Sequence, residues 1–259
     1  MNAFDPMIRI STITLVGCGG TGAQLARTIA RLVYDLRQRR MHAPQIRLID
    51  PDLVELKNTG RQLFVPGDCG KHKTEVLGKR FNRALGLDIA WITEPVDADR
   101  HFDSYSSTLV VGAVDTHEAR RELARVNGVW IDCGNHHEAG QVCIGTTGDR
   151  DVMLRHIDGD RGKYRQLPNA ALLFPQLLEP EPEAEPVSEP ASCAELMATG
   201  DQHLLVNDLV ACVAGQYLYK LLHRQPIHSF PSYVSVDAIT VRSLPIEKSE
   251  LLAYLQPAG

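Results

Sequence analysis

The sequence lacks three things: long uncharged apolar runs, closely paired cysteines and an excess of positive charge. No uncharged run reaches the length that spans a bilayer, and the first residues, MNAFDPMIRIST, contain no apolar core of signal-peptide length. The six cysteines include no Cys-x-x-Cys pair, so nothing indicates a disulfide framework. We therefore expect a cytoplasmic protein with free thiols that does not contact a membrane.

The formal net charge is −5, and its distribution is uneven. Residues 175–192 contain five glutamates and five prolines but no lysine or arginine, and outside this segment the formal charges balance. A body without net positive charge lacks the electrostatic footprint typical of nucleic-acid-binding proteins, so nucleic acid is an unlikely partner. The segment itself cannot bury enough apolar surface to fold, which predicts a mobile crossover loop within one domain.

Apolar periodicity predicts a doubly wound, Rossmann-like α/β fold with a mostly parallel sheet. Strands are expected at 10–16, 45–50, 88–93, 108–114 and 128–134, with helices at 21–39, 73–85 and 116–126. Residues 139–147 alternate as a strand antiparallel to its predecessor, and a helix at 201–224 precedes one or two terminal strands. We expect a single domain, 1–259, with a core at 8–148, the loop at 175–192 and the terminal helix and strands at 193–259.

A glycine-rich turn joins the first strand to the first helix, with the pattern Gly17-x-Gly19-x-x-Gly22 and an extra Gly20. In such a turn the first glycine permits the tight bend, the second lets a nucleotide approach the backbone, and the third lets helix and strand pack closely. Asp50 follows the second strand, where a carboxylate can accept hydrogen bonds from a ribose. These features fit NAD as well as ATP.

The next segment favours ATP. Arg61 and Lys73 supply a forked donor and a point charge, which suit a polyphosphate, and a dehydrogenase would have no use for them. The same span offers two polar side chains, Asn58 and Gln62. Asp115 follows the apolar strand 108–114, at the sheet edge where ligands bind, and a carboxylate facing phosphates there is a natural ligand for Mg²⁺.

These residues lie in stretches that resemble the ThiF/MoeB/ubiquitin-activating-enzyme superfamily, whose members adenylate the C-terminal carboxylate of a small ubiquitin-like protein. The resemblance covers about Ile10–Thr147 in the stretches LVGCGGTG, LIDPDLVELKNTGRQLF, GKHKTEVL, VVGAVDTHEAR and WIDCGNHHEAGQV. The later stretch SCAELMATGDQHLLVNDLVA is similar to the region after the crossover loop in bacterial ThiF-like proteins, in particular those of PRTRC-type systems.

The resemblance implies a role for each matching residue, with ATP and Mg²⁺ as cofactors. Asp50 would bind the ribose hydroxyls, Lys73 the phosphate oxygens, and Asp115 the magnesium ion. The other nucleotide-binding residues implied are Gly17, Gly19, Gly20, Gly22, Asp52, Asn58, Arg61 and Gln62. The partner would be a small ubiquitin-like or sulfur-carrier protein with a free C-terminal carboxylate. Family members usually work as dimers, so a homodimer is expected.

Several family members carry two Cys-x-x-Cys pairs that bind zinc, and this sequence has neither. We therefore expect no such zinc. Cys133, His136, His137 and Cys143 are zinc-type ligands close together in sequence. The interpretation we favour is a hairpin with two exposed histidines and two buried thiols.

Cys193 is the best candidate for a second step, in which the activated partner is transferred to a thiol. It follows the Pro/Glu-rich loop and precedes residues that read as helical, and a helix N-terminus would lower the pKa of its thiol. The alternative is a small residue at a loop–helix junction. Asn207 and Asp208, further on, are expected to cap or satisfy the terminal helix.

Other functions remain open from sequence alone. An NAD(P)-dependent oxidoreductase would use the glycine turn, but no dehydrogenase-type His/Arg/Asp set follows later in the chain. A tRNA-modifying member of the same superfamily fits the motifs and is disfavoured by the absence of a basic surface. A non-catalytic module that kept only the fold is disfavoured by the intact set of Asp50, Arg61, Lys73 and Asp115.

Overall fold

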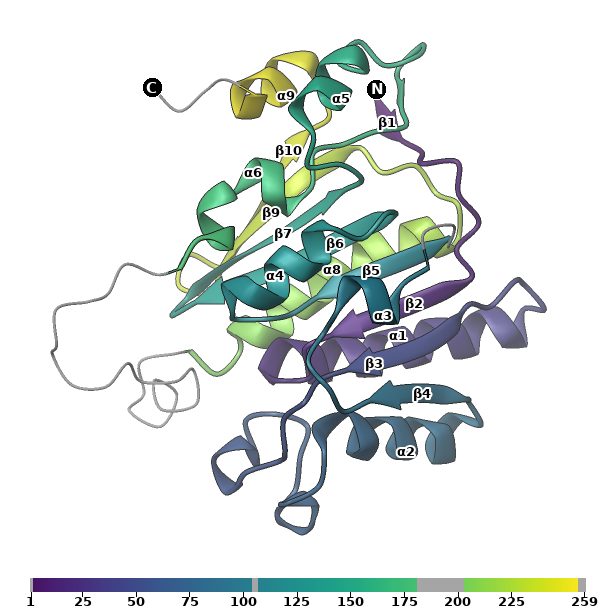
Figure 1. Cartoon of the computed structure of the whole chain (residues 1–259), viewed down its shortest axis with the longest axis vertical. Coiled ribbons are helices and arrows are strands. Elements are labelled where there is room, and N and C mark those ends of the chain that lie inside the picture. Colours follow the sequence, from purple (N-terminus) through teal and green to yellow (C-terminus); the bar gives the residue numbers. More distant parts are fainter. Residues whose placement is uncertain (1, 104–106, 181–202, 256–259) are drawn as a thin grey trace, which may run out of the picture.

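The computed structural model describes residues 2–103, 107–180 and 203–255, and its centre is an eight-stranded sheet (Figure 1). The strand order is β10-β9-β7-β6-β5-β2-β3-β4. Strands β4, β3, β2, β5 and β6 run parallel, and the pairs from β6 to β10 are antiparallel. The bounds are β2 (Thr12–Val16), β3 (Gln45–Ile49), β4 (Ile89–Ile92), β5 (Thr108–Gly112), β6 (Val129–His136), β7 (Ala139–Gly145), β9 (Ser229–Ser235) and β10 (Thr240–Pro245). This architecture confirms the predicted fold class.

The central strands are buried along nearly their whole length because both faces of the sheet are covered. All five residues of β5 are buried, and so are four of the five in β2. The chain passes from β2 to β3 on one side and returns to β5 on the other, so the strand order reverses between β2 and β5. Open α/β sheets bind ligands at such a reversal, beyond the carboxyl ends of the strands.

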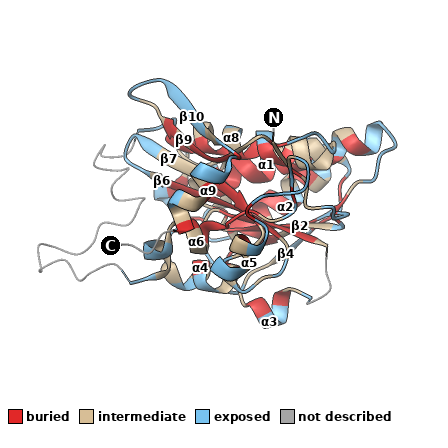
Figure 2. Ribbon diagram, turned by 90° about the horizontal axis from the view of Figure 1, so that it is seen from above, coloured by how far each residue is buried: buried red, intermediate tan, exposed pale blue. Residues whose placement is uncertain are grey.

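Three long helices cover one face of the sheet: α1 (Gly20–Gln38), α2 (Lys73–Leu85) and α8 (Val206–Leu222) (Figure 1). Helix α1 lies between the other two and contacts both. Its apolar positions recur with helical spacing, and Leu25, Ile29 and Leu36 have no exposed surface. On the other face lie α4 (His117–Ala124) and α6 (Ala170–Leu173), which contact each other. Figure 2 shows the buried residues concentrated between these layers.

The terminal helix starts later than the sequence predicts. Residues 203–205 are not helical, and α8 begins at Val206, so the prediction that the helix begins at Asp201 is wrong over these three residues. The first residues of the predicted mobile loop, Pro175–Leu178, form the 3-10 helix η3, which contacts α4 and α6. The rest of that loop, and Cys193, lie outside the described residues.

Several short elements have no counterpart in the sequence prediction. They are β1 (Ala3–Phe4), β8 (Lys163–Tyr164), α3 (Ala98–His101), α5 (Arg150–Arg155), α9 (Lys248–Leu255), η1 (Leu56–Asn58) and η2 (Pro66–Asp68). Strands β1 and β8 pair in parallel as a separate two-stranded sheet. Within the described ranges, no helix combines the length and the apolarity needed to cross a membrane.

Candidate functional site

The glycine turn connects β2 to α1 at the point where the strand order reverses. Gly17 has a φ of +87°, and a Cβ there would lie 2.3 Å from the carbonyl oxygen of Ala113, which follows β5. A Cβ on Gly22 would lie 1.9 Å from the carbonyl oxygen of Gly17. At Gly19 a Cβ would meet no heavy atom within 4 Å. Gly17 and Gly22 therefore allow close packing of strand, turn and helix, whereas Gly19 borders open space.

Asp50 ties the end of β3 to this turn. Its side chain accepts hydrogen bonds from the backbone N–H of Cys18 at 2.5 Å and from that of Asp52 at 2.8 Å. Only 6% of Asp50 is exposed, and this burial raises the pKa of its carboxyl above the usual value, although Lys73 and the two N–H groups act to lower it. Each carboxylate oxygen has a second lone pair that these bonds leave available.

Lys73, the first residue of α2, places a buried cation beside Asp50. It is 8% exposed, and its Nζ donates to Oδ2 of Asp52 at 2.8 Å. Burial acts to lower the pKa of Lys73, but the carboxylates of Asp50 and Asp52 outweigh it, and the net pKa is raised. The ammonium group therefore stays charged at the glycine turn.

Three predicted phosphate-binding residues lie in the loop between β3 and α2. Asn58 is buried and organises the loop: its Oδ1 accepts from the N–H of Glu55 at 2.8 Å, and its carbonyl accepts from the N–H of Gln62 at 3.0 Å. Oε1 of Gln62 is buried and has no hydrogen-bond partner in the part of the chain that the structure describes. Arg61 is half-buried and forms no hydrogen bond or ion pair with the described part of the chain. Its guanidinium is available to an anion.

Asp115 lies just beyond β5, two residues after Ala113. It is exposed, its carbonyl accepts a long bond of 3.5 Å from Nη1 of Arg120, and its carboxylate has no partner within the described ranges. The structure thus joins Cys18, Asp50, Asp52 and Lys73 at the turn. Neither Arg61 nor Asp115 forms a hydrogen bond or ion pair with that group among the described residues.

The residues present can accommodate Mg²⁺ only together with a ligand. Within the described ranges, no three His, Cys, Asp or Glu side chains gather closely enough to hold a metal ion by themselves. Mg²⁺ is commonly held by one or two carboxylates, substrate phosphates and water, and the unpaired carboxylate of Asp115 fits such a set.

The hairpin of β6 and β7 has the predicted arrangement, with two exposed histidines and two buried thiols. Cys133 and Cys143 are 4% and 0% exposed, while His136 and His137 at the tip are exposed. Burial raises the pKa of both thiols well above the usual value. These cysteines therefore serve as core residues.

One polar cluster was not foreseen. Asn207, expected to cap α8, instead reaches across to α1, where its Oδ1 accepts from the hydroxyl of Thr21 at 2.8 Å. Oδ1 also accepts from Nδ2 of Asn135, near the end of β6. The partners are separated by up to 186 residues, so no local pattern in the sequence could have revealed the contact.

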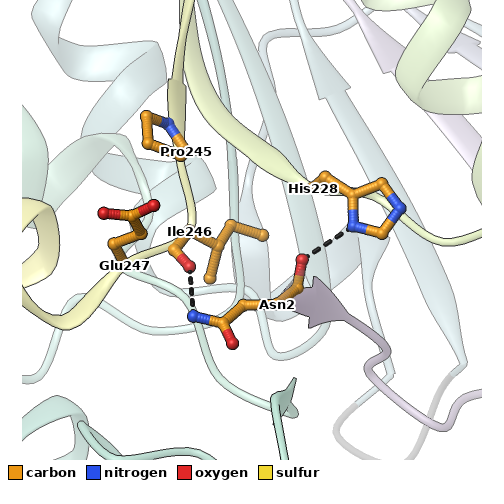
Figure 3. A pocket seen from close by; sticks show the side chains of 5 residues that line it. All are labelled: Asn2, His228, Pro245, Ile246 and Glu247. Carbon is orange, nitrogen blue, oxygen red and sulfur yellow. Dashed lines mark hydrogen bonds between the residues drawn. The ribbon is translucent and has the colours of Figure 1, made fainter.

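A cavity of about 310 Å³ lies elsewhere in the molecule, close to β1 and the end of β10 (Figure 3). Its lining comprises Asn2, His228, Pro245, Ile246 and Glu247. Asn2 donates from Nδ2 to the carbonyl of Ile246 at 2.8 Å, and its own carbonyl lies 2.7 Å from Nδ1 of His228. None of the predicted site residues lines this cavity.

Comparison with known proteins supports the resemblance seen in the sequence. The model of the ThiF family matches residues 6–251. Among solved structures, Escherichia coli MccB is similar, with 17% identity, a TM-score of 0.58 and coverage of 92% of this chain and 62% of MccB. MccB with ATP has 16% identity and a TM-score of 0.55, with coverage of 92% of this chain and 64% of MccB. MccB with AMPCPP and selenomethionine MccA has 17% identity and a TM-score of 0.57, with the same two coverages.

The chain thus spans less than two thirds of the length of these MccB chains, and at this identity the likeness shows a shared fold. No curated protein matches the sequence. The family model, in contrast, extends over nearly the whole chain. On that evidence, this protein belongs to the ThiF family.

Proposed function

We propose that the protein uses ATP to adenylate the C-terminal carboxylate of a small ubiquitin-like or sulfur-carrier protein. Membership of the ThiF family supports this, as does the likeness in fold to MccB, which has been solved with ATP. The observation that carries the proposal is the buried cation of Lys73 beside Asp50, at a glycine turn that opens a long helix. ATP presents a triphosphate to this cation, whereas a nicotinamide dinucleotide presents only a pyrophosphate.

The reaction needs no protein nucleophile. A carboxylate oxygen of the partner attacks the α-phosphorus of ATP, the bond from that phosphorus to the bridging oxygen breaks, and pyrophosphate leaves with the electron pair. The product is an acyl-adenylate. Catalysis then rests on positioning the two reactants and on stabilising the negative charge that develops on the phosphate oxygens.

The charges at the glycine turn explain why Lys73 alone cannot bind a polyphosphate. Asp50 and Asp52 together carry more negative charge than Lys73 offsets, so a polyphosphate requires further cations. Arg61 can supply a forked donor because nothing in the described ranges neutralises it. Asp115 would hold Mg²⁺, which when bound neutralises phosphate charge. Asp50 would accept from the ribose hydroxyls, and Asn58 would act by fixing the loop that carries Arg61 and Gln62.

The proposal includes a second step at Cys193 and action as a homodimer. The thiolate of Cys193 would attack the acyl carbonyl, forming a thioester and releasing AMP. An adduct between the two proteins that added thiol cleaves, as it cleaves a thioester, tests this step on a denaturing gel. The adduct should be lost in Cys193→Ala while adenylation persists; an adduct that survives the substitution would show that another thiol is used.

The activity is tested by pyrophosphate–ATP exchange with small proteins encoded near this one. Exchange should require the partner's C-terminal carboxylate, so a partner truncated at that end is the control. Lys73→Ala and Asp115→Ala should both lower exchange strongly. Absence of exchange with every such partner, combined with tight binding of NADH, would instead support an oxidoreductase.

A further inference from the structure

The cluster of Thr21, Asn135 and Asn207 lies at the first turn of α1, directly beside the glycine turn. Thr21 and Asn207 are 7% and 3% exposed. Besides its bond to Asn207, the hydroxyl of Thr21 accepts from Nδ2 of Asn135 at 2.8 Å. The amide oxygen of Asn207 thus joins the start of α1, the end of β6 and the start of α8.

The NH₂ group of the Asn207 amide, Nδ2, does not take part in these contacts. Nδ2 is buried and has no hydrogen-bond partner among the described residues. It lies against the first residue of α1: a Cβ on Gly20 would be only 2.6 Å from it. Burying an amide N–H₂ group without an acceptor is unfavourable, so a purely structural role accounts for Oδ1 but not for Nδ2.

The missing acceptor is suggested by the backbone at the same place. Within the described ranges, no residue accepts a hydrogen bond from the N–H groups of Gly20, Thr21 or Gly22. Free N–H groups at the start of a 19-residue helix form a site for an anion, and Gly19 leaves the approach open. Two independent features, one from the backbone and one from a distant side chain, therefore call for the same kind of ligand.

From this juxtaposition we propose that Nδ2 of Asn207 donates to a phosphoryl oxygen bound at the first turn of α1. Asn207 is then a nucleotide-binding residue supplied by the C-terminal helix. This inference rests on the proposed use of ATP. It adds a residue that lies outside the stretches Ile10–Thr147 in which the sequence placed the nucleotide site.

Asn207→Asp tests the proposal because it keeps an acceptor for Thr21 and Asn135 and replaces only the donor by an anionic oxygen. Asn169→Asp is the matched control: Asn169 is 5% exposed and accepts from the N–H of Ala171 at the start of α6, which a carboxylate does equally well. Binding of ATP and of adenosine to the full chain is measured by titration calorimetry. We expect Asn207→Asp to weaken ATP binding at least tenfold while adenosine binds as before, and Asn169→Asp to match the wild type.

Asn207→Ala, which removes both halves of the amide, provides a second measure if it folds. If Asn207→Asp binds ATP as tightly as the wild type, or loses ATP and adenosine equally, the phosphate contact is wrong although the proposed function stands. If the wild type itself binds no ATP, the proposed function fails, and this inference fails with it.

Discussion

Lys73 and Asp52 form an ion pair whose two ends differ sharply in exposure. Nζ lies 2.8 Å from Oδ2, yet 10% of the lysine side chain is exposed against 63% of the aspartate. The carboxylate can therefore turn into solvent at little cost, whereas the ammonium group remains at the glycine turn. This asymmetry suits a cation that exchanges a carboxylate for a phosphate when the nucleotide binds.

Replacing Lys73 by Ala should lower pyrophosphate–ATP exchange by about 100-fold or more, the usual effect of removing a preorganised group that stabilises transition-state charge. Lys79→Ala on the same helix is the control, because Lys79 is exposed and pairs with Glu75. Equal activity of the two variants would mean that Lys73 only supports the fold.

A substitution of Arg61 should affect activity without affecting stability. Because it has no partner among the described residues, Arg61→Ala should leave the melting temperature unchanged while exchange falls by about 100-fold. Arg80→Ala, in contrast, should lower the melting temperature, because Arg80 donates to Oδ2 of Asp68 at 2.7 Å and to the carbonyl of Leu63. A marked loss of stability in Arg61→Ala would contradict this assignment.

Two substitutions in the glycine turn, Gly22→Ala and Gly19→Ala, should have different effects. Gly22→Ala places a methyl group 1.9 Å from the carbonyl oxygen of Gly17, which the backbone cannot accommodate, so the melting temperature should drop strongly. Gly19→Ala meets no atom within 4 Å and should fold normally, but its methyl group would obstruct a nucleotide. Thermal unfolding with and without ATP distinguishes them: Gly19→Ala should keep its melting temperature and lose the stabilisation by ATP. Normal stabilisation by ATP would show that no ligand approaches there.

Much of the fold could be predicted because the elements involved are long and periodic. Helix α2 spans Lys73–Leu85, as predicted, and β5 and β7 start at the predicted residues, Thr108 and Ala139. The antiparallel pairing of β7 with β6 was also predicted, because residues 139–147 alternate as a strand that directly follows its neighbour in sequence. In a long element many residues are buried, so the pattern of apolar residues repeats often enough to be recognised in the sequence.

The stretch directly after Gly148 was harder to predict because its helices, α5 and α6, are too short to show a period. Helices α5 and α6 are recognisable mainly by their caps: Asp149 accepts from the N–H groups of Asp151 and Val152, and Asn169 from that of Ala171. The candidate site was predicted as far as its residues lie near one another in sequence. Asn207 could not be placed there because its contact with Thr21 depends on the packing of α8 against α1.

Asp132 gives the chain a pH dependence that has no connection with catalysis. It lies in β6 with no exposed surface, and neither carboxylate oxygen has a hydrogen-bond partner within the described ranges. Nε of Arg120 lies 3.7 Å from its Oδ1. Burial raises the pKa of this carboxyl from its ordinary value of 3.8 to about 6, although Arg120 acts to lower it. The folded chain therefore keeps a proton that the unfolded chain has already released.

Between these two pKa values the folded state binds more protons than the unfolded state, so the free energy of unfolding should fall as the pH rises and level off above about pH 6. Asp132 accounts for about 3 kcal/mol of this fall, since one pKa unit corresponds to 1.36 kcal/mol. Asp50, whose pKa burial also raises, acts in the same direction. Urea unfolding of the wild type and of Asp132→Asn at several pH values isolates the contribution of Asp132, because all other groups are common to both proteins. If the two curves run parallel, the buried carboxyl does not titrate in this interval.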